Sequence, residues 1–218
     1  MRQDPVRRLV RFLFHHLYHS YAWSYDLVAA AVSLGRWRQW VRASLPFIHG
    51  PRVLELAFGT GMLQQSLLAD QRRMIAGIEE SAQMVGVTTR RLRRAGLCSG
   101  NLIRGLAQRL PYTSGAFDCA VSTFPNEFIV DPNTLAEVRR VLRPGGRLIV
   151  VPVAWIVGAR FIDRAAAWLF KTTHQSPEPK AQEVARRFMA PLELAGFKPG
   201  YRTIDLDGST LLVMIGSK

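Results

Sequence analysis

Two glycines and a carboxylate have the spacing of a site for a nucleoside-containing ligand. Gly59 and Gly61 lie in a turn between a predicted strand over 53–57 and a predicted helix over 61–69. Because glycine has no Cβ, this turn can press its backbone against a ligand, and the unpaired amides at the start of the helix point at it. Glu79 ends the next apolar strand about twenty residues on, where a carboxylate accepts hydrogen bonds from ribose hydroxyls. The sequence therefore predicts a nucleoside-containing cofactor at the carboxyl edge of a parallel sheet.

A second carboxylate, Glu55, indicates which kind of nucleoside derivative this turn suits. It lies at the end of the first strand, inside the motif ELAFGTG over 55–61. Dinucleotide sites carry G-x-G-x-x-G/A, with glycines that let a pyrophosphate approach. A carboxylate at this point would repel a pyrophosphate, whereas it suits a ligand that carries an ammonium and a sulfonium.

A parallel sheet is needed to position these residues, and the chain has the alternation of strands and helices that forms one. The predicted strands are 53–57, 74–78, 101–105, 117–122, 147–153, 199–206 and 209–216, and the predicted helices that accompany them are 61–69, 81–95, 132–142 and 180–195. Strands that alternate with helices form a parallel sheet with right-handed crossovers. The last two strands form a hairpin, which adds an antiparallel strand.

Helical segments flank this unit and have the composition of a cover over a pocket. Residues 5–20 predict a basic, aromatic-rich helix, and 23–45 predict one or two more, with Gly35 as the break. Residues 158–171 predict a further amphipathic helix. We therefore divide the chain into an N-terminal helical cap over 1–50 and a cofactor-binding domain over 51–218.

The net charge of +13 at pH 7 is unusual for an enzyme of small molecules. Such a field attracts polyanions, either nucleic acid or an anionic membrane surface. The arginines within 90–94 favour plain solvated surface as much as a binding role, because cations at the end of a helix are favourable. The sequence has no apolar run long enough to span a bilayer. We therefore expect a cytoplasmic protein, with peripheral attachment at the inner membrane face through the N-terminal basic helix.

Metal chemistry and disulfides find no support in the sequence. The three histidines His15, His16 and His19 have no carboxylate or cysteine beside them, so no metal site is predicted. Cys98 and Cys119 are expected to be reduced thiols.

Five motifs in order resemble the class I S-adenosylmethionine (SAM) dependent methyltransferases. The turn over 55–61 is similar to their first motif, [DE]-x-G-x-G-x-G. Four further segments are similar to G-x-D-x-S-x-x-M, G-D-A-x-x-L-P-F, F-D-x-V and L-x-P-G-G-x-L; they are GIEESAQM (77–84), GLAQRLPY (105–112), FDCAV (117–121) and LRPGGRL (142–148). The resemblance covers roughly residues 50–218 and is greatest to the small-molecule group that includes the menaquinone and ubiquinone methyltransferases.

This resemblance implies a Rossmann-like, doubly wound, mostly parallel seven-stranded sheet with an antiparallel last strand, and SAM as cofactor. It also implies a set of cofactor-binding residues around the carboxyl edge of that sheet, namely Glu55, Ala57, Phe58, Gly59, Gly61, Glu79, Glu80, Met84, Leu106, Ala107, Gln108 and Thr123.

Three of these residues depart from the family's pattern. Ala57 replaces the first glycine of the loop, and because alanine is small we expect it to be tolerated if its φ is negative. Phe58 is bulky and could crowd the methionine end of the cofactor. Leu106 replaces the aspartate that contacts the adenine amino group in the family, so adenine would be held by backbone groups near Leu106 and Ala107, or by Gln108.

The acceptor is expected beyond the carboxyl ends of the fourth and fifth predicted strands. Asn126 and Glu127 follow the fourth strand and could bind or deprotonate an acceptor, or could cap the next element. Phe124 and Trp155 could present aromatic faces there. Tyr25 lies in a segment, YDLVA (25–29), that resembles the pocket-covering Y-D-x-x-A element of small-molecule methyltransferases.

The sequence therefore predicts a SAM-dependent methyltransferase that acts on a small acceptor, lipophilic or membrane-associated because the covering helices are apolar and aromatic. Two alternatives stay open. A nucleic-acid methyltransferase would use the positive field, although no N-P-P-[YF] motif follows the fourth strand. A non-catalytic binding protein of the same fold would result if Phe58 and Leu106 abolish cofactor binding.

Overall fold

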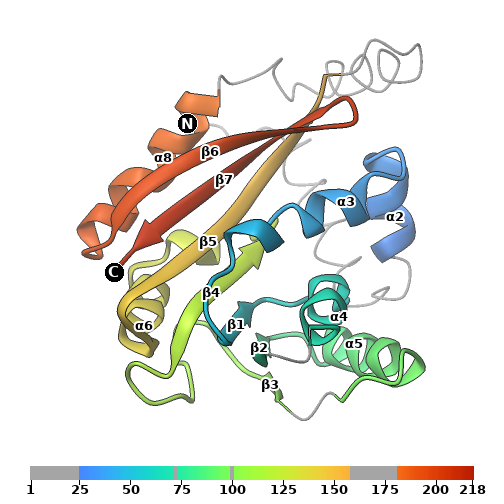
Figure 1. Cartoon of the computed structure of the whole chain (residues 1–218), viewed down its shortest axis with the longest axis horizontal. Coiled ribbons are helices and arrows are strands. Elements are labelled where there is room, and N and C mark those ends of the chain that lie inside the picture. Colours follow the sequence, from blue (N-terminus) through green and yellow to red (C-terminus); the bar gives the residue numbers. More distant parts are fainter. Residues whose placement is uncertain (1–24, 71–72, 99–100, 158–180) are drawn as a thin grey trace, which may run out of the picture.

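A computed structural model describes residues 25–70, 73–98, 101–157 and 181–218, which form a seven-stranded sheet with helices on both faces (Figure 1). The strands are β1 (Arg52–Leu56), β2 (Met74–Glu79), β3 (Leu102–Arg104), β4 (Phe117–Thr123), β5 (Leu142–Ile156), β6 (Lys198–Leu206) and β7 (Ser209–Ser217). The helices are α2 (Tyr25–Val32), α3 (Trp37–Arg42), α4 (Met62–Leu68), α5 (Ala82–Arg94), α6 (Pro132–Val141) and α8 (Ala181–Leu194), with short 3-10 turns η2 (Leu45–Phe47) and η3 (Glu127–Val130).

The strand order reverses beside β1, and the position outside the carboxyl ends of the strands at this switch point is here called the crevice. The order is β3-β2-β1-β4-β5-β7-β6, with β1 to β5 parallel and β7 antiparallel to both of its neighbours. The chain reaches the edge at β3 and then returns to place β4 on the other side of β1. Ligands bind at such a switch point, outside the carboxyl ends of the strands. The predicted Rossmann-like sheet with its antiparallel last strand is confirmed.

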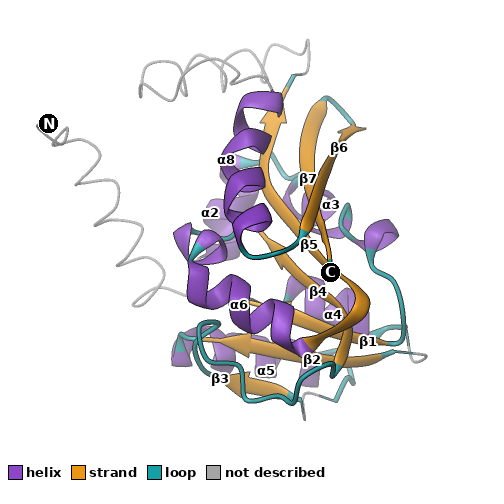
Figure 2. Cartoon of the chain, turned by 90° about the vertical axis from the view of Figure 1, so that its left-hand side faces the viewer, coloured by secondary structure: helices purple, strands orange, loops and turns teal. Residues whose placement is uncertain are grey.

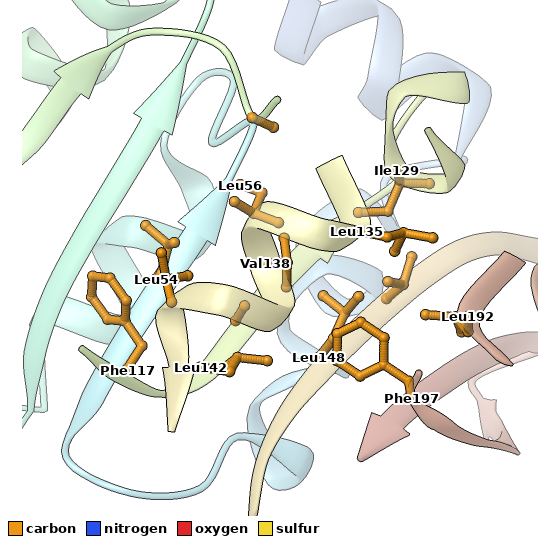
Figure 3. Packing of buried hydrophobic residues seen from close by; sticks show 14 of the residues in the cluster. Leu54, Leu56, Phe117, Ile129, Leu135, Val138, Leu142, Leu148, Leu192 and Phe197 are labelled. Carbon is orange, nitrogen blue, oxygen red and sulfur yellow. The ribbon is translucent and has the colours of Figure 1, made fainter. Parts of the chain in front are cut away.

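One face of the sheet is covered by α6 and α8, which lie along the same side in Figure 2. Leu54 and Leu56 of β1 belong to the apolar core on this face. Leu135 and Val138 of α6 pack in the same core, together with Leu192 of α8 (Figure 3). All five side chains are buried, so this face gives the sheet a continuous apolar support.

The opposite face is covered by α3 and α4. Val53 of β1 packs there with Leu63 and Leu67 of α4, and Trp40 and Val41 of α3 complete the cluster. Because successive residues of a strand face opposite sides, Glu55 lies on this second face with Val53. The predicted boundary at residue 51 stays a prediction, and α3 shares its core with the sheet.

The element boundaries agree with the sequence in most places and differ at β5. The helical region after residue 25 breaks at Gly35, whose φ is +80°, as predicted. Strand β5 begins at Leu142 rather than 147, because Leu142 already pairs with Phe117 and the segment after it forms a bulge. Gly145 and Gly146 lie in this bulge and exchange backbone hydrogen bonds with Lys218. The helices predicted over 5–20 and 158–171 lie outside the described residues.

A charge cluster fixes the amino edge of the sheet, opposite the crevice. Asp118 of β4 is 5% exposed and accepts hydrogen bonds from Arg52 N at 2.8 Å and from the Arg52 side chain. Arg143 forms a second ion pair with it. Burial alone would raise the pKa of Asp118, but the hydrogen bonds and charge of Arg52, with the hydrogen bond of Arg143, bring it below its usual value.

Candidate active site

The turn between β1 and α4, here called the glycine loop (residues 57–61), crosses the carboxyl edge of the sheet with a left-handed backbone at three residues. The φ angles are +52° at Ala57, +53° at Gly59 and +76° at Gly61. The condition under which alanine was expected to be tolerated, a negative φ at Ala57, is therefore not met. A left-handed conformation costs a residue with a Cβ about 1–2 kcal/mol. Ala57 N donates to Ile78 O at 2.8 Å, and this bond to the end of β2 holds the loop in place.

Helix α5 holds the glycine loop from behind. Thr88 Oγ1 donates to Gly59 O at 2.7 Å, and Arg91 Nη1 donates to Thr60 O at 2.8 Å. A Cβ on Gly61 would lie 2.3 Å from Thr88 Cγ2, so both the conformation and the close packing require glycine there. The loop is therefore fixed by side chains of a helix that begins after the next strand.

Neither Thr88 nor Arg91 stands out in the sequence as a contact of the loop. The charge pattern over 90–94 indicates either solvated surface or polyanion binding, whereas Arg91 bonds to the loop. The spacing of Thr88 and Arg91 is the one sequence signal for their shared role, because residues three apart lie on one face of a helix.

Glu79, at the end of β2, lies directly against the glycine loop. Its Oε2 accepts from Gly59 N at 3.0 Å and its Oε1 accepts from Ser81 N at 2.9 Å, and the residue is 2% exposed. A Cβ built on Gly59 would meet no atom within 4 Å. The loop therefore has an open side next to a carboxylate whose position is fixed by two backbone amides.

Glu55 lies below the loop in a polar pair with Gln64 of α4. Both residues are buried, and Gln64 Nε2 donates to Ala76 O at 3.3 Å. Among the residues that the structure describes, neither Glu55 Oε2 nor Gln64 Oε1 has a hydrogen-bond partner. Burial raises the pKa of Glu55 well above its usual value; the contact with Gln64 opposes this rise, and the charge of Glu79 adds to it.

Phe58 is turned into the protein at the glycine loop. It is 4% exposed, and a Cβ on Gly77 of β2 would lie 2.7 Å from Phe58 Cδ1 and 2.6 Å from Gln64 Nε2. The ring therefore fills the space above Gly77, beside the polar pair. This packing explains why a bulky residue fits in the loop, and a contact of Phe58 with the cofactor stays a prediction.

The segment after β3 brings the predicted adenine-binding residues beside Glu79. Gly105 N donates to Glu79 O at 2.9 Å, which places the following residues next to the carboxyl end of β2. Leu106 is 49% exposed and Ala107 is buried, and Gln108 is partly buried. An apolar surface therefore stands where the resembling family has a carboxylate.

An ion pair on α6 fixes this segment. Glu137 Oε2 accepts from Leu110 N at 2.8 Å, and Arg140 donates to Leu110 O at 2.9 Å and to Tyr112 O at 2.7 Å. The two side chains also bond to each other at 2.6 Å. The bond with Arg140 holds the pKa of Glu137 below its usual value. Sequence reasoning did not find these residues, because a pair three apart on a helix is common on any surface.

The two remaining predicted residues near β2 have different surroundings. Glu80 is exposed, and its carbonyl accepts from Arg104 Nε at 3.2 Å. Met84 is fully buried in α5, so it offers no surface to a ligand in this structure.

The carboxyl end of β4 is on the other side of the crevice. Ser122 Oγ donates to Leu56 O at 2.9 Å, which joins β4 to the end of β1, and Thr123 is partly buried. Phe124 follows with a φ of +50° and donates its amide to Val151 O at 2.7 Å. A left-handed backbone at a bulky residue is uncommon, so the chain turns sharply here.

Phe124 packs against α3. Its ring centroid lies 4.5 Å from that of Trp37 and 6.2 Å from that of Trp40. Phe124 and Trp37 are partly buried and Trp40 is 6% exposed. These three rings, here called the aromatic wall (Trp37, Trp40 and Phe124), therefore pack together where the chain leaves the carboxyl end of β4. Trp155 of β5 packs in the core on the opposite face.

The three predicted catalytic residues are placed as follows. Asn126 and Glu127 are exposed, and Asn126 Oδ1 accepts from Phe128 N at 3.0 Å, which caps η3. Tyr25 is the first residue of α2, and its side chain lies outside what the structure describes. Their catalytic roles stay predictions.

The described residues contain neither a candidate metal site nor a helix that could cross a membrane. Over residues 25–70, 73–98, 101–157 and 181–218, no group of three or more His, Cys, Asp or Glu side chains could hold a metal ion. In the same ranges, no helix is both long and apolar enough to cross a membrane.

The sequence comparisons point to one family. The sequence model of the ubiE/COQ5 methyltransferase family matches residues 7–173. A ubiquinone/menaquinone biosynthesis C-methyltransferase, UbiE, of Erwinia tasmaniensis is 34% identical over 142 residues, which are 62% of this chain and 57% of the relative. The enzyme of the same name from Haemophilus ducreyi is 32% identical over 146 residues, which are 64% and 56% of the two chains. The chain thus spans little more than half the length of these relatives.

Solved structures show the same fold at low identity. A SAM-dependent methyltransferase of Thermotoga maritima has a TM-score of 0.60 and 20% identity, with 93% of this chain and 98% of that one covered. Another, from Aquifex aeolicus, has a TM-score of 0.57 and 18% identity, with 83% and 88% covered. The match to the family model implies SAM as the cofactor. The family match covers 167 of 218 residues (7 to 173), and the chain belongs to the ubiE/COQ5 methyltransferase family.

Proposed function

We propose that this protein is a SAM-dependent methyltransferase that methylates a ring carbon of a quinone-type, lipophilic acceptor. The observation that carries this proposal is the contact between Glu79 Oε2 and Gly59 N. It sets a carboxylate against the open side of a glycine-bearing loop, at the switch point of a parallel sheet. Such a carboxylate accepts hydrogen bonds from ribose hydroxyls.

The residues around the crevice fit the parts of SAM. A carboxylate accepts about four hydrogen bonds, so the two amide contacts of Glu79 are compatible with binding a ribose. The buried, unpartnered Glu55 Oε2 suits the ammonium of the amino-acid tail. The open side at Gly59 leaves room for that tail. Leu106, Ala107 and the backbone beside them would contact adenine, where hydrophobic surface suits a base.

The chemistry requires alignment more than activation by the protein. When bound, SAM supplies a methyl group on a positively charged sulfur, which is a good leaving group. The rigid glycine loop and the end of β4 would align donor and acceptor, and such positioning can supply most of the rate. A ring carbon loses a proton on methylation, so a base beside it would help. We assign this role to Glu127, with Asn126 and Tyr25 as positioning partners.

The aromatic wall and the names of the relatives support an aromatic acceptor. Planar rings stack on aromatic side chains, and Phe124, which follows the carboxyl end of β4, packs against Trp37. The relatives are named as C-methyltransferases of ubiquinone and menaquinone biosynthesis. Because this chain covers little more than half of their length, its acceptor need not be identical to theirs.

We also infer that the enzyme works from the cytoplasm at an anionic membrane surface. A lipophilic acceptor partitions into lipid, and the net charge of +13 favours binding to anionic headgroups. The N-terminal arginines that would make this contact lie outside the described residues. Sedimentation with vesicles that contain anionic lipid, with and without residues 1–20, tests this inference, and equal binding by both forms would contradict it.

A transfer assay tests the enzymatic function. The purified chain is incubated with methyl-labelled SAM and a short-chain prenylated naphthohydroquinone, and the product is analysed by mass spectrometry and NMR. A new ring methyl group supports the proposal. If the protein binds S-adenosylhomocysteine but transfers no methyl group to carbon, the proposed acceptor is wrong. If it does not bind S-adenosylhomocysteine at millimolar concentration, the proposed methyltransferase function is wrong.

A further inference from the structure

The polar pair of Glu55 and Gln64 lacks a hydrogen-bond donor within the described part of the chain. Glu55 is 2% exposed and Gln64 is fully buried, and the buried oxygens Glu55 Oε2 and Gln64 Oε1 accept no hydrogen bond from the described residues. The amide of Gln64 is oriented by the bond from its Nε2 to Ala76 O, which leaves Oε1 facing away from that bond. A buried polar atom without a partner costs about 1–3 kcal/mol, so this pair is an unusual feature of the fold.

Among the described residues, no cation acts on Glu55 to balance an ionised carboxylate. On β2, Glu79 acts on it with a negative charge. On α4, the group beside it is the neutral amide of Gln64. From α5, Arg91 reaches the same loop but bonds to the Thr60 carbonyl and hydroxyl. An isolated ionised carboxylate is expensive to bury, so the neutral form of Glu55 is the one that this environment favours.

We propose, as an extension of the proposed function, that Glu55 binds the ammonium of the cofactor in exchange for a proton. In the ligand-free protein the carboxyl carries a proton, which supplies the donor that the pair with Gln64 lacks. When the ammonium arrives, the O–H bond breaks, its electron pair stays on the carboxylate, and the proton passes to the solvent. The ammonium then takes the proton's place as donor. Burial, which raises the pKa of Glu55 well above its usual value, agrees with this exchange.

Proton linkage gives this exchange a measurable signature. A carboxyl that is protonated in the free protein and ionised in the complex releases up to about one proton for each ligand bound. The dissociation constant should therefore fall by up to about tenfold for each pH unit, until the carboxyl ionises in the free protein as well. A ligand without the ammonium should bind without releasing the proton.

Two ligands and two buffers test the proposal by calorimetry. S-adenosylhomocysteine carries the ammonium, and 5′-methylthioadenosine has the same nucleoside without the amino-acid tail. Binding heats are compared between phosphate and Tris at several values from about pH 6 to pH 8, because the difference in buffer ionisation heat reports the protons released. We expect proton release with S-adenosylhomocysteine and none with methylthioadenosine.

The variant Glu55→Gln keeps the shape of the side chain and removes its titration. It should release no proton and bind S-adenosylhomocysteine about tenfold or more weakly, with its affinity for methylthioadenosine unchanged.

Equal proton release by both ligands would overturn the proposal, because the proton would then come from a group near the ribose. Binding of both ligands without any release would overturn it and leave the methyltransferase function standing. Failure of both ligands to bind would overturn the function as well. Since the wild-type protein decides between these outcomes, poor folding of the variant does not remove the test.

Discussion

The two sides of the crevice are built in different ways. The cofactor side, made by the ends of β1 and β2, is held by hydrogen bonds from three side chains, namely Thr88 and Arg91 of α5 and Glu79 of β2. The acceptor side, beyond β4, is held by ring packing between Phe124 and the helix α3. Directional polar contacts fix a geometry closely, whereas packed rings fix a shape and tolerate changes of detail. We therefore expect the cofactor to be recognised through directional hydrogen bonds and the acceptor through shape.

Removing the carboxylate of Glu79 should have the largest effect. In Glu79→Ala the amides of Gly59 and Ser81 lose their acceptor, and ribose hydroxyls lose theirs. Since a hydrogen bond to a charged group contributes about 1.5–3 kcal/mol, we expect S-adenosylhomocysteine affinity to fall about 100-fold or more by calorimetry. The matched control is Glu193→Gln, an exposed carboxylate on α8. A loss below about threefold in Glu79→Ala would show that the cofactor side does not depend on this contact.

Truncating the aromatic wall should affect the acceptor alone. In Trp37→Ala the ring beside Phe124 is lost, and an aromatic contact contributes about 0.5–1.5 kcal/mol beyond its buried area. We expect kcat/KM for the naphthohydroquinone to fall about tenfold, with the affinity for S-adenosylhomocysteine unchanged. If both ligands lose affinity equally, the two sides of the crevice are not independent.

Asp118 tests whether the site depends on the opposite edge of the sheet. In Asp118→Asn the ion pairs with Arg52 and Arg143 are lost, and we expect the free energy of unfolding to fall by about 2 kcal/mol at about pH 7, with cofactor affinity unchanged. The folded-state pKa of Asp118 is lowered, so its stabilisation is present above the unfolded value of about 3.9 and is lost as the pH falls through the folded value. Urea unfolding at neutral and acid pH should therefore show a difference between the proteins that shrinks in acid, and a constant difference would contradict this account.

Loosening the back of the glycine loop should have a moderate effect on the cofactor side. Arg91→Met keeps the aliphatic stem and removes the bonds to Thr60, so we expect S-adenosylhomocysteine to bind about threefold to tenfold more weakly. Arg93→Met, an exposed arginine on the same helix, is the control. Equal behaviour of the two variants would mean that α5 does not position the loop.

The smallest expected effect is a gain in stability from replacing Ala57 by glycine. Ala57→Gly relieves a left-handed backbone at a residue with a Cβ, and we expect about 1 kcal/mol of added stability in urea unfolding. Gly208→Ala, at a φ of +73° in the β6–β7 hairpin, should move stability in the opposite direction. A loss of stability in Ala57→Gly would show that the alanine methyl group makes contacts that outweigh the strain.

The sequence predicted the elements that periodicity controls, and most of the cofactor side. Strand and helix order follows from alternating apolar runs, and Glu79 was found because its place after a buried strand fixes its direction. Thr88 and Arg91 were not found, because which face of α5 meets the glycine loop depends on how that helix crosses α4. The sign of φ at Ala57 and the packing of Phe58 against Gly77 likewise depend on tertiary contacts that the local sequence does not reveal. On the acceptor side, the ring contacts join α3 to the end of β4, which are more than eighty residues apart, counted from Trp37 to Phe124.

The bonds from α5 to the glycine loop bear on any attempt to make this very basic protein easier to handle. A common way to reduce nonspecific adsorption is to replace surface arginines by neutral or acidic residues, and the run at 90–94 is an obvious target. Arg93 and Arg94 are exposed and are suitable for such replacement. Arg91 looks equivalent in the printed sequence, yet replacing it would remove the hydrogen bond to a backbone carbonyl of the glycine loop. A variant at Arg91 would therefore be easier to purify but would bind its ligand less well.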